Sequence, residues 1–125
     1  MSKYFYDSFA IIELLKGNAK YSKYFSEYEG VTSFHNANEV YYIMLREEGE
    51  EKGKIALDYL RQMTIHLDFE IIEESMKFRY KNKKSKFSYA DCLGYIAARK
   101  NNLVFLTGDS GFKNFPNVEF VEREK

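Results

Sequence analysis

The sequence predicts an α/β protein with a parallel sheet that helices cover on both faces. Short apolar or aromatic segments alternate with longer amphipathic segments along the chain, which is typical of parallel β-α crossovers. Of the 125 residues, 45% are hydrophobic and 18% aromatic, which is enough to form one core, and the sequence shows no repeat or linker. We therefore expect a single domain over residues 1–125.

Five segments have the character of short strands. The first is aromatic and is followed at once by Asp7. The third alternates apolar residues with His66 and Asp68, as a half-buried strand does. The fourth is an apolar run. The predicted strands are 3–6, 31–34, 64–69, the run that ends before Gly108, and 118–121.

Between these strands, apolar residues recur every three or four positions, as on the buried face of a helix. Gly17 stops the first helix, and Gly49 with Gly53 brackets a break between two later ones. The last helix begins with a capping pattern at Ser88. The predicted helices are 8–16, 18–28, 36–48, 54–63, 70–80 and the one that begins at Ser88.

Composition excludes several classes of protein. Basic and acidic residues number 19 each, so the net charge gives no global case for a nucleic-acid partner. The single Cys92 excludes an internal disulfide and a cysteine-based zinc site. No apolar run approaches the ~20 residues of a membrane span, and the N-terminus has no signal peptide. We therefore expect a cytoplasmic protein with no membrane association.

Four acids stand where a strand ends or the next helix begins, and each has a simple structural interpretation. Asp7 can cap a helix. Glu39 can reach back to Asn36 as a capping pair, and Asp91 has the same spacing after Ser88. Asp109 can be an ordinary turn residue.

Taken together, these acids indicate a metal site. The strand ends of a parallel sheet lie on one rim, and carboxylates that converge there repel one another unless protons or a cation neutralise them. Ligand sets made only of oxygen favour Mg²⁺ or Mn²⁺, which serve in phosphodiester hydrolysis. The hydroxyls of Ser8 and Thr107 are placed to orient these carboxylates.

Four motifs carry a resemblance to a known family. They are YFYDS (4–8), EV (39–40), SYAD (88–91) followed by IAA (96–98), and LTGDSGF (106–112). With these motifs the whole chain resembles a PIN domain, specifically the short VapC-like toxin ribonucleases. The resemblance implies a three-layer α/β/α sandwich with a five-stranded parallel sheet.

The same resemblance implies an activity and its residues. The acidic quartet of the family falls on Asp7, Glu39, Asp91 and Asp109, as catalytic residues and metal ligands. A Mg²⁺- or Mn²⁺-dependent endoribonuclease is therefore expected, as the toxin of a type II toxin–antitoxin pair, with an RNA substrate, a cognate antitoxin and a homodimeric assembly.

A basic loop precedes the last helix. Lys83, Lys84 and Lys86 lie in it, a few residues before Asp91. They could track the phosphates of RNA, or simply form a solvated loop.

Three alternatives remain. The protein could be a solitary RNA-processing nuclease, or a PIN fold that has lost activity and only binds a partner. A receiver-like signalling module shares the size and the acidic pocket, but it needs adjacent acids after the first strand, and here Ser8 follows Asp7.

Overall fold

The computed structural model describes residues 3–122. Within this part of the chain, five parallel strands form one sheet in the order β3-β2-β1-β4-β5. β1 lies at the centre and pairs with both β2 and β4. The predicted α/β fold with five parallel strands is confirmed. The strands are β1 (Tyr4–Tyr6), β2 (Gly30–Ser33), β3 (Thr64–Ile65), β4 (Val104–Thr107) and β5 (Val118–Phe120).

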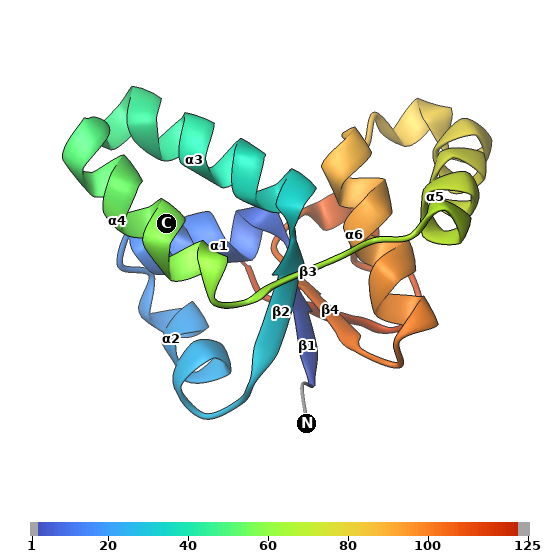
Figure 1. Cartoon of the computed structure of the whole chain (residues 1–125). Coiled ribbons are helices and arrows are strands. Elements are labelled where there is room, and N and C mark those ends of the chain that lie inside the picture. The colour runs from blue at the N-terminus through green and yellow to red at the C-terminus, as the bar shows by residue number, and fades with distance from the viewer. Residues whose placement is uncertain (1–2, 123–125) are drawn as a thin grey trace.

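Helices cover both faces of the sheet, so the chain forms three layers. Figure 1 shows α3 and α4 on one side of the strands and α5 and α6 on the other. α1 and α2 join the side of α3 and α4. The helices are α1 (Ser8–Leu15), α2 (Ala19–Ser26), α3 (Phe34–Glu48), α4 (Glu50–Arg61), α5 (Phe69–Lys81) and α6 (Tyr89–Lys100), with short 3-10 helices η1 (Lys83–Ser85) and η2 (Ser110–Phe112).

Side chains alternate along the central strands, so each strand contributes to a core on both faces. Tyr4 and Tyr6 of β1 belong to the core with α1–α4, and Phe5 belongs to the core with α5 and α6. β4 divides in the same way, with Leu106 on the first side and Phe105 on the second. The rings of Phe5 and Phe105 stack with their centres 6.1 Å apart, which holds β1 and β4 in register beneath α6.

Several of the 11 tyrosines lie in the core, where their hydroxyl groups bond to backbone carbonyls. Tyr6, Tyr21 and Tyr95 are fully buried, and each hydroxyl donates to a backbone carbonyl at 2.6, 2.7 and 2.8 Å respectively. A buried carbonyl without a partner would cost about 1–3 kcal/mol. Tyrosine therefore fills the core with its ring and satisfies the backbone with its hydroxyl.

The break between α3 and α4 lies at Gly49 alone, where φ is +95°. The predicted break as far as Gly53 is wrong, because Gly53 is buried inside α4. A Cβ atom there would lie 3.3 Å from the ring of Tyr41 and 3.5 Å from the backbone of Leu45. Glycine at this position therefore serves the close packing of α4 on α3.

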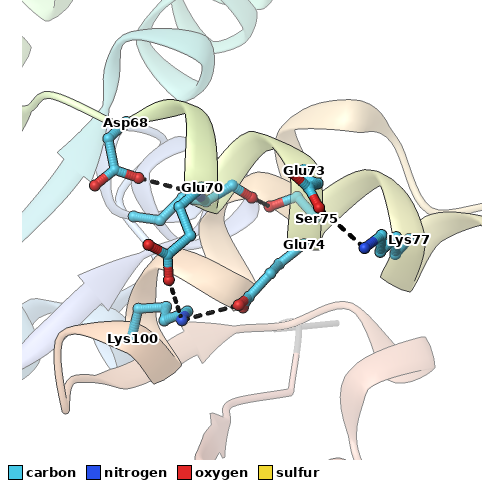
Figure 2. Close-up of polar contacts among 8 residues, drawn as sticks. Asp68, Glu70, Glu73, Glu74, Ser75, Lys77 and Lys100 are labelled. Carbon is cyan, nitrogen blue, oxygen red and sulfur yellow. Dashed lines mark hydrogen bonds and ion pairs between the residues drawn. The ribbon is translucent and has the colours of Figure 1, made fainter.

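The third strand is shorter than predicted, covering Thr64–Ile65 in place of 64–69. Asp68, which fitted the alternating strand pattern, instead caps α5 and accepts a hydrogen bond from the amide of Ile71 at 2.9 Å (Figure 2). Leu67 is buried beside α5 and α6 rather than along a strand. The alternation of apolar and polar residues that predicted a longer strand therefore reflects a core residue, Leu67, followed by a helix cap, Asp68.

Exposed ion pairs connect α5 to the end of α6. Lys100 bonds to both Glu70 and Glu74 at 2.8 Å, while Lys77 pairs with Glu73 within α5 (Figure 2). Such surface pairs contribute about 0–1 kcal/mol each. The apolar contacts between α5 and α6 therefore provide most of the stability of this layer.

No helix within residues 3–122 is both long enough and apolar enough to cross a membrane.

Candidate active site

The predicted site lies at the carboxyl edge of the sheet, between β1 and β4. These strands are neighbours, yet the chain continues from β1 toward β2 on one side and from β4 toward β5 on the other. In parallel α/β sheets, a switch of direction of this kind opens the crevice where ligands bind. Asp7 directly follows β1, and Thr107 ends β4. The topology therefore places both residues at the mouth of this crevice.

Asp7 is the buried acid of the site, with 1% of its surface exposed. It caps α1, where Oδ1 accepts a hydrogen bond from the amide of Ser8 at 2.9 Å. Oδ2 accepts a bond from the hydroxyl of Thr107 at 2.6 Å. Burial raises the pKa of Asp7 well above its ordinary value, and the charges of Asp91 and Glu39 raise it further, against the opposing effect of the two hydrogen bonds.

Asp109 follows in the tight turn after β4. Its amide donates to the hydroxyl of Thr107 at 3.0 Å, and its Oδ1 accepts from the amide of Gly111 at 2.9 Å. Gly108, between Thr107 and Asp109, has no room for a side chain, because a Cβ atom would lie 2.3 Å from the ring of Phe9. The turn is therefore fixed by packing on one side and by hydrogen bonds on the other, with Asp109 half-buried.

The two carboxylate oxygens of Asp91 differ, because one is bonded within the helix cap and the other is not. Oδ2 accepts from the amide of Ser88 at 2.8 Å, while the Ser88 hydroxyl accepts from the amide of Asp91, so the predicted capping box is present. Within residues 3–122, Oδ1 has no hydrogen-bond partner. Burial raises the pKa of Asp91 to about 6, and the charges of Glu39 and Asp109 add to this effect.

α6 reaches the other acids because it packs very close to the sheet. A Cβ atom on Gly94, one turn after Asp91, would lie 2.7 Å from the ring of Phe5 and 3.1 Å from that of Phe105. The glycine thus lets the first turn of α6, with Asp91, approach the ends of β1 and β4.

Glu39 lies in α3, which begins earlier than predicted. The helix starts at Phe34, and its cap is Ser33, whose hydroxyl accepts from the amide of Asn36 at 3.2 Å. The simple structural interpretation of Glu39, as a capping pair with Asn36, is therefore wrong. Glu39 sits in the second turn of the helix and is half-buried, free of a capping role.

Asn36 is a residue of the site that the sequence did not reveal. It is fully buried, and its amide donates to the hydroxyl of Ser8 at 2.9 Å while its Oδ1 accepts from Ser33 at 2.6 Å. The signal was a polar residue in line with Val40 and Met44 on the buried stripe of α3. The hydroxyl of Ser8 thus bonds to Asn36, and only the backbone amide of Ser8 holds a carboxylate.

The four predicted acids form one electrostatic group. Asp7 is influenced by Asp91 and Glu39, and Asp91 by Glu39 and Asp109. Within residues 3–122, none of the four forms an ion pair with a Lys, Arg or His side chain. The structure thus concentrates negative charge at one rim without supplying a protein cation to balance it.

This donor set fits a hard divalent cation. Carboxylate oxygens are the ligands of Mg²⁺ and Mn²⁺, and a cation would relieve the repulsion that adds to the effect of burial on the pKa values of Asp7 and Asp91. In the described part of the chain, no three His, Cys, Asp or Glu side chains lie close enough together to hold a metal ion as they stand. The chemistry of the acids, rather than a preformed cage, is what favours a metal.

The predicted basic loop lies exposed beside the start of α6. Lys83 and Lys84 belong to η1, and Lys86 follows in the left-handed conformation with φ of +59°. None of the three forms an ion pair within residues 3–122. Their charges are therefore available to an external anion.

The remaining reactive side chains lie outside this group. His35 and His66 are exposed. Cys92 is fully buried, and burial raises the pKa of its thiol to about 12, so the thiolate form is scarce at neutral pH.

Several solved structures are similar to this chain, and three of them show the range of the likeness. The VapC20 toxin of Mycobacterium tuberculosis, described as cleaving the sarcin–ricin loop, is 18% identical over 98% of this chain and 100% of its own, with a TM-score of 0.79. A toxin–antitoxin complex from Klebsiella pneumoniae is 19% identical over 97% and 100%, with a TM-score of 0.76. PAE2754 from Pyrobaculum aerophilum is 14% identical over 96% and 91%, with a TM-score of 0.66. At these identities the likeness shows the fold.

A search of curated proteins finds no match. The family model of the PIN domain matches residues 4–118, a range that contains all four acids and Thr107. The chain therefore belongs to the PIN domain family.

Proposed function

We propose that this protein is a Mg²⁺- or Mn²⁺-dependent endoribonuclease that hydrolyses RNA phosphodiesters. The observation that carries the proposal is the carboxylate of Asp7, which is buried, bonded to Thr107 and close enough to Asp91 and Glu39 for their charges to raise its pKa. A buried carboxylate that repels its neighbours is costly to fold and serves structure poorly. It is, however, well suited to hold a cation against a phosphodiester.

In this proposal the four acids have different roles in binding the metal ion. Asp7, with both oxygens bonded by the protein, is the fixed ligand, and Asp91 offers its open Oδ1. Glu39 and Asp109 complete the negative rim from α3 and from the turn after β4. A bound divalent cation would polarise the phosphoryl oxygens and lower the pKa of water. Thr107 keeps Asp7 and the turn of Asp109 in one arrangement.

We further propose that the enzyme is the toxin of a type II toxin–antitoxin pair that acts in the cytoplasm as a homodimer. Support comes from the fold shared with a protein described as a toxin–antitoxin complex and with the VapC20 toxin. A pocket of about 460 Å³ between α3 and α4, lined by Ala37, Tyr41, Leu57 and Leu60 among others, offers apolar surface for a partner. The aromatic rings of α1 and α2 offer less surface to a partner, because most of them pack in the core.

Growth experiments separate the toxin from a solitary RNA-processing nuclease. A toxin should arrest a bacterial host on induction, and the arrest should be absent with the Asp91→Asn variant and relieved by co-expression of a small DNA-binding protein encoded next to its gene. An RNA-processing enzyme would cleave RNA in vitro without these effects. An inactive binding protein would show neither cleavage nor a dependence on Asp91.

The receiver-like alternative is wrong. Receiver-type sheets have the strand order 2-1-3-4-5, whereas this sheet has the order β3-β2-β1-β4-β5 and the chain belongs to the PIN family.

A further inference from the structure

The ring of Tyr89 lies exposed at the first position of α6, with 62% of the residue's surface accessible. One side of the ring is occupied by the guanidinium of Arg79, whose central carbon lies 4.2 Å from the ring centre. The guanidinium is itself fixed, because Nε donates to the carbonyl of Phe87 at 3.1 Å. The exposed tyrosine therefore has a cationic backing that limits its motion.

Core packing does not explain this ring. Tyr95, six residues further along α6, is fully buried and donates its hydroxyl to the carbonyl of Pro116. Tyr89, in contrast, contacts no other aromatic ring within residues 3–122. An aromatic ring that is held in place and left in water is a ready surface for another flat, apolar group.

The position of Tyr89 relates it to the acids. It precedes Asp91 by two residues in the first turn of α6, which separates them by about 3 Å along the helix axis and about 200° around it. Tyr89 therefore faces away from the four acids, on the side of α5, from which Arg79 comes. A group stacked on its ring would lie outside the four acids, on the α5 side of α6.

The loop that leads to Tyr89 is rich in positive charge. Lys83, Lys84 and Lys86 lie exposed in the loop between Arg79 and Tyr89, with no ion pair in the described residues, and Lys83 lies 4.9 Å from the exposed ring of Tyr80. Cations next to exposed aromatic rings are the combination that binds single-stranded nucleic acid: the cations contact phosphates and the rings stack with bases.

We propose that Tyr89, backed by Arg79, is a stacking platform for a base of unpaired RNA that extends past the four acids on the α5 side of α6. This inference rests on the proposed ribonuclease function and names its substrate class. A base can stack on Tyr89 only when it is free of a pairing partner, so a single-stranded segment or loop is required on this side. Because every base has an aromatic face, the platform tolerates different bases.

The test uses a short unstructured RNA with 2-aminopurine, whose fluorescence is quenched when it stacks on an aromatic ring. Binding is measured by titration in the Asp91→Asn background, which keeps the RNA intact. Tyr89→Phe preserves the ring and Tyr89→Ala removes it. Tyr28→Ala is the matched control, because Tyr28 is also exposed and has Lys3 4.5 Å from its ring, but it lies just before β2 at the opposite edge of the sheet.

We expect Tyr89→Ala to weaken binding by about 10-fold and to abolish the quenching, while leaving the salt dependence of binding unchanged. Tyr89→Phe and Tyr28→Ala should bind like the background. A duplex of the same sequence should bind less tightly, with no difference between Ala and Phe at position 89. Equal affinity and quenching for Tyr89→Ala and Tyr89→Phe would overturn the inference.

The two proposals fail separately. If the parent protein cleaves the RNA in Mn²⁺ but Tyr89→Ala binds as the background does, only the platform is wrong. If Tyr89→Ala loses the quenching but the parent does not cleave RNA in Mg²⁺ or Mn²⁺, Tyr89 stacks with a base of bound RNA and the ribonuclease activity is wrong. A parent protein that neither binds nor cleaves RNA contradicts both.

Discussion

The hydroxyl of Thr107 donates a 2.6 Å hydrogen bond to Asp7, a residue 100 positions earlier in the chain. The same hydroxyl accepts the amide proton of Asp109 at 3.0 Å. One side chain at the end of β4 thus connects the acid after β1 with the acid of the following turn. It can do so because β1 and β4 pair in register, with Tyr6 opposite Leu106.

Removing the Thr107 hydroxyl should impair the site more than the fold. In Thr107→Val, Asp7 loses a donor and the Asp109 amide loses its acceptor, in a space that the new methyl group fills. We expect a loss of about 1–3 kcal/mol in the free energy of unfolding and about 10- to 100-fold in RNA cleavage. Thr107→Ser keeps the hydroxyl and should stay within a few-fold of the parent in both measurements.

The buried Asn36 should be needed to hold α3 against α1. Asn36→Ala removes the donor to the Ser8 hydroxyl and the acceptor of the Ser33 hydroxyl, which keeps only its bond from the backbone amide of residue 36, so we expect a loss of about 2–3 kcal/mol in thermal or urea unfolding. Asn38→Ala is the matched control, because Asn38 is exposed on the same helix and should change stability by less than about 0.5 kcal/mol. Equal effects of the two substitutions would show that the hydrogen bonds of Asn36 contribute little.

Stability without metal should fall as the pH rises through the pKa of Asp91. The folded protein holds this proton more tightly than the unfolded chain, because the pKa is raised to about 6. The stability of the parent therefore decreases from about pH 4 upward through pH 6, and Asp7 extends the decrease. Asp91→Asn keeps the acceptor for Ser88 and removes the charge, so it should be more stable than the parent at pH 7.5 by roughly 1–3 kcal/mol.

Urea unfolding in EDTA at several pH values measures this difference. Comparing the two proteins cancels the titration of the other acids, and the difference should shrink toward zero near pH 4, where Asp91 is protonated in the folded state. A difference in unfolding free energy that does not vary with pH, or a parent that is the more stable protein at pH 7.5, would show that the charge of Asp91 does not destabilise the fold.

The basic loop should contribute long-range attraction to RNA. Replacing Lys83, Lys84 and Lys86 with Ala together should weaken RNA binding and reduce the salt slope of log K by about 2, since each phosphate contact on a single strand contributes about 0.7. Replacing Lys20, Lys23 and Lys52 together removes the same charge from α2 and α4, in the other helical layer. If both triple variants changed the slope equally, the loop would have no specific role.

Much of the fold could be predicted because its signals are local. The alternation of strand-like and helical segments gives the parallel sheet, and the acid at the end of the first strand stands one residue from its boundary. The capping box of Ser88 and Asp91 is likewise complete within four residues. The positions of Asp7, Asp91 and Asp109 follow from these boundaries, whereas Glu39 lies in the second turn of a helix that begins earlier than predicted. The catalytic roles of all four acids stay predictions.

The remainder depends on contacts between distant segments. Asn36 looks like a cap in the sequence, but its amide finds Ser8, 28 residues earlier, only after α1 and α3 have packed. Gly53 looks like a helix break, but in the folded chain it serves the close approach of α4 to α3. The cation–aromatic pair of Arg79 and Tyr89 likewise requires that α5 and α6 lie together.

Cleavage of RNA by the parent protein and by Asp91→Asn, side by side in Mg²⁺, Mn²⁺ and EDTA, tests the central claim most directly. Circular dichroism and thermal unfolding serve to show that the variant is folded. The four-acid site predicts that the parent cuts RNA only with a divalent cation and that the folded variant is slower by more than about 100-fold. A folded Asp91→Asn variant that cuts as fast as the parent, or a parent that cuts equally well in EDTA, would contradict it.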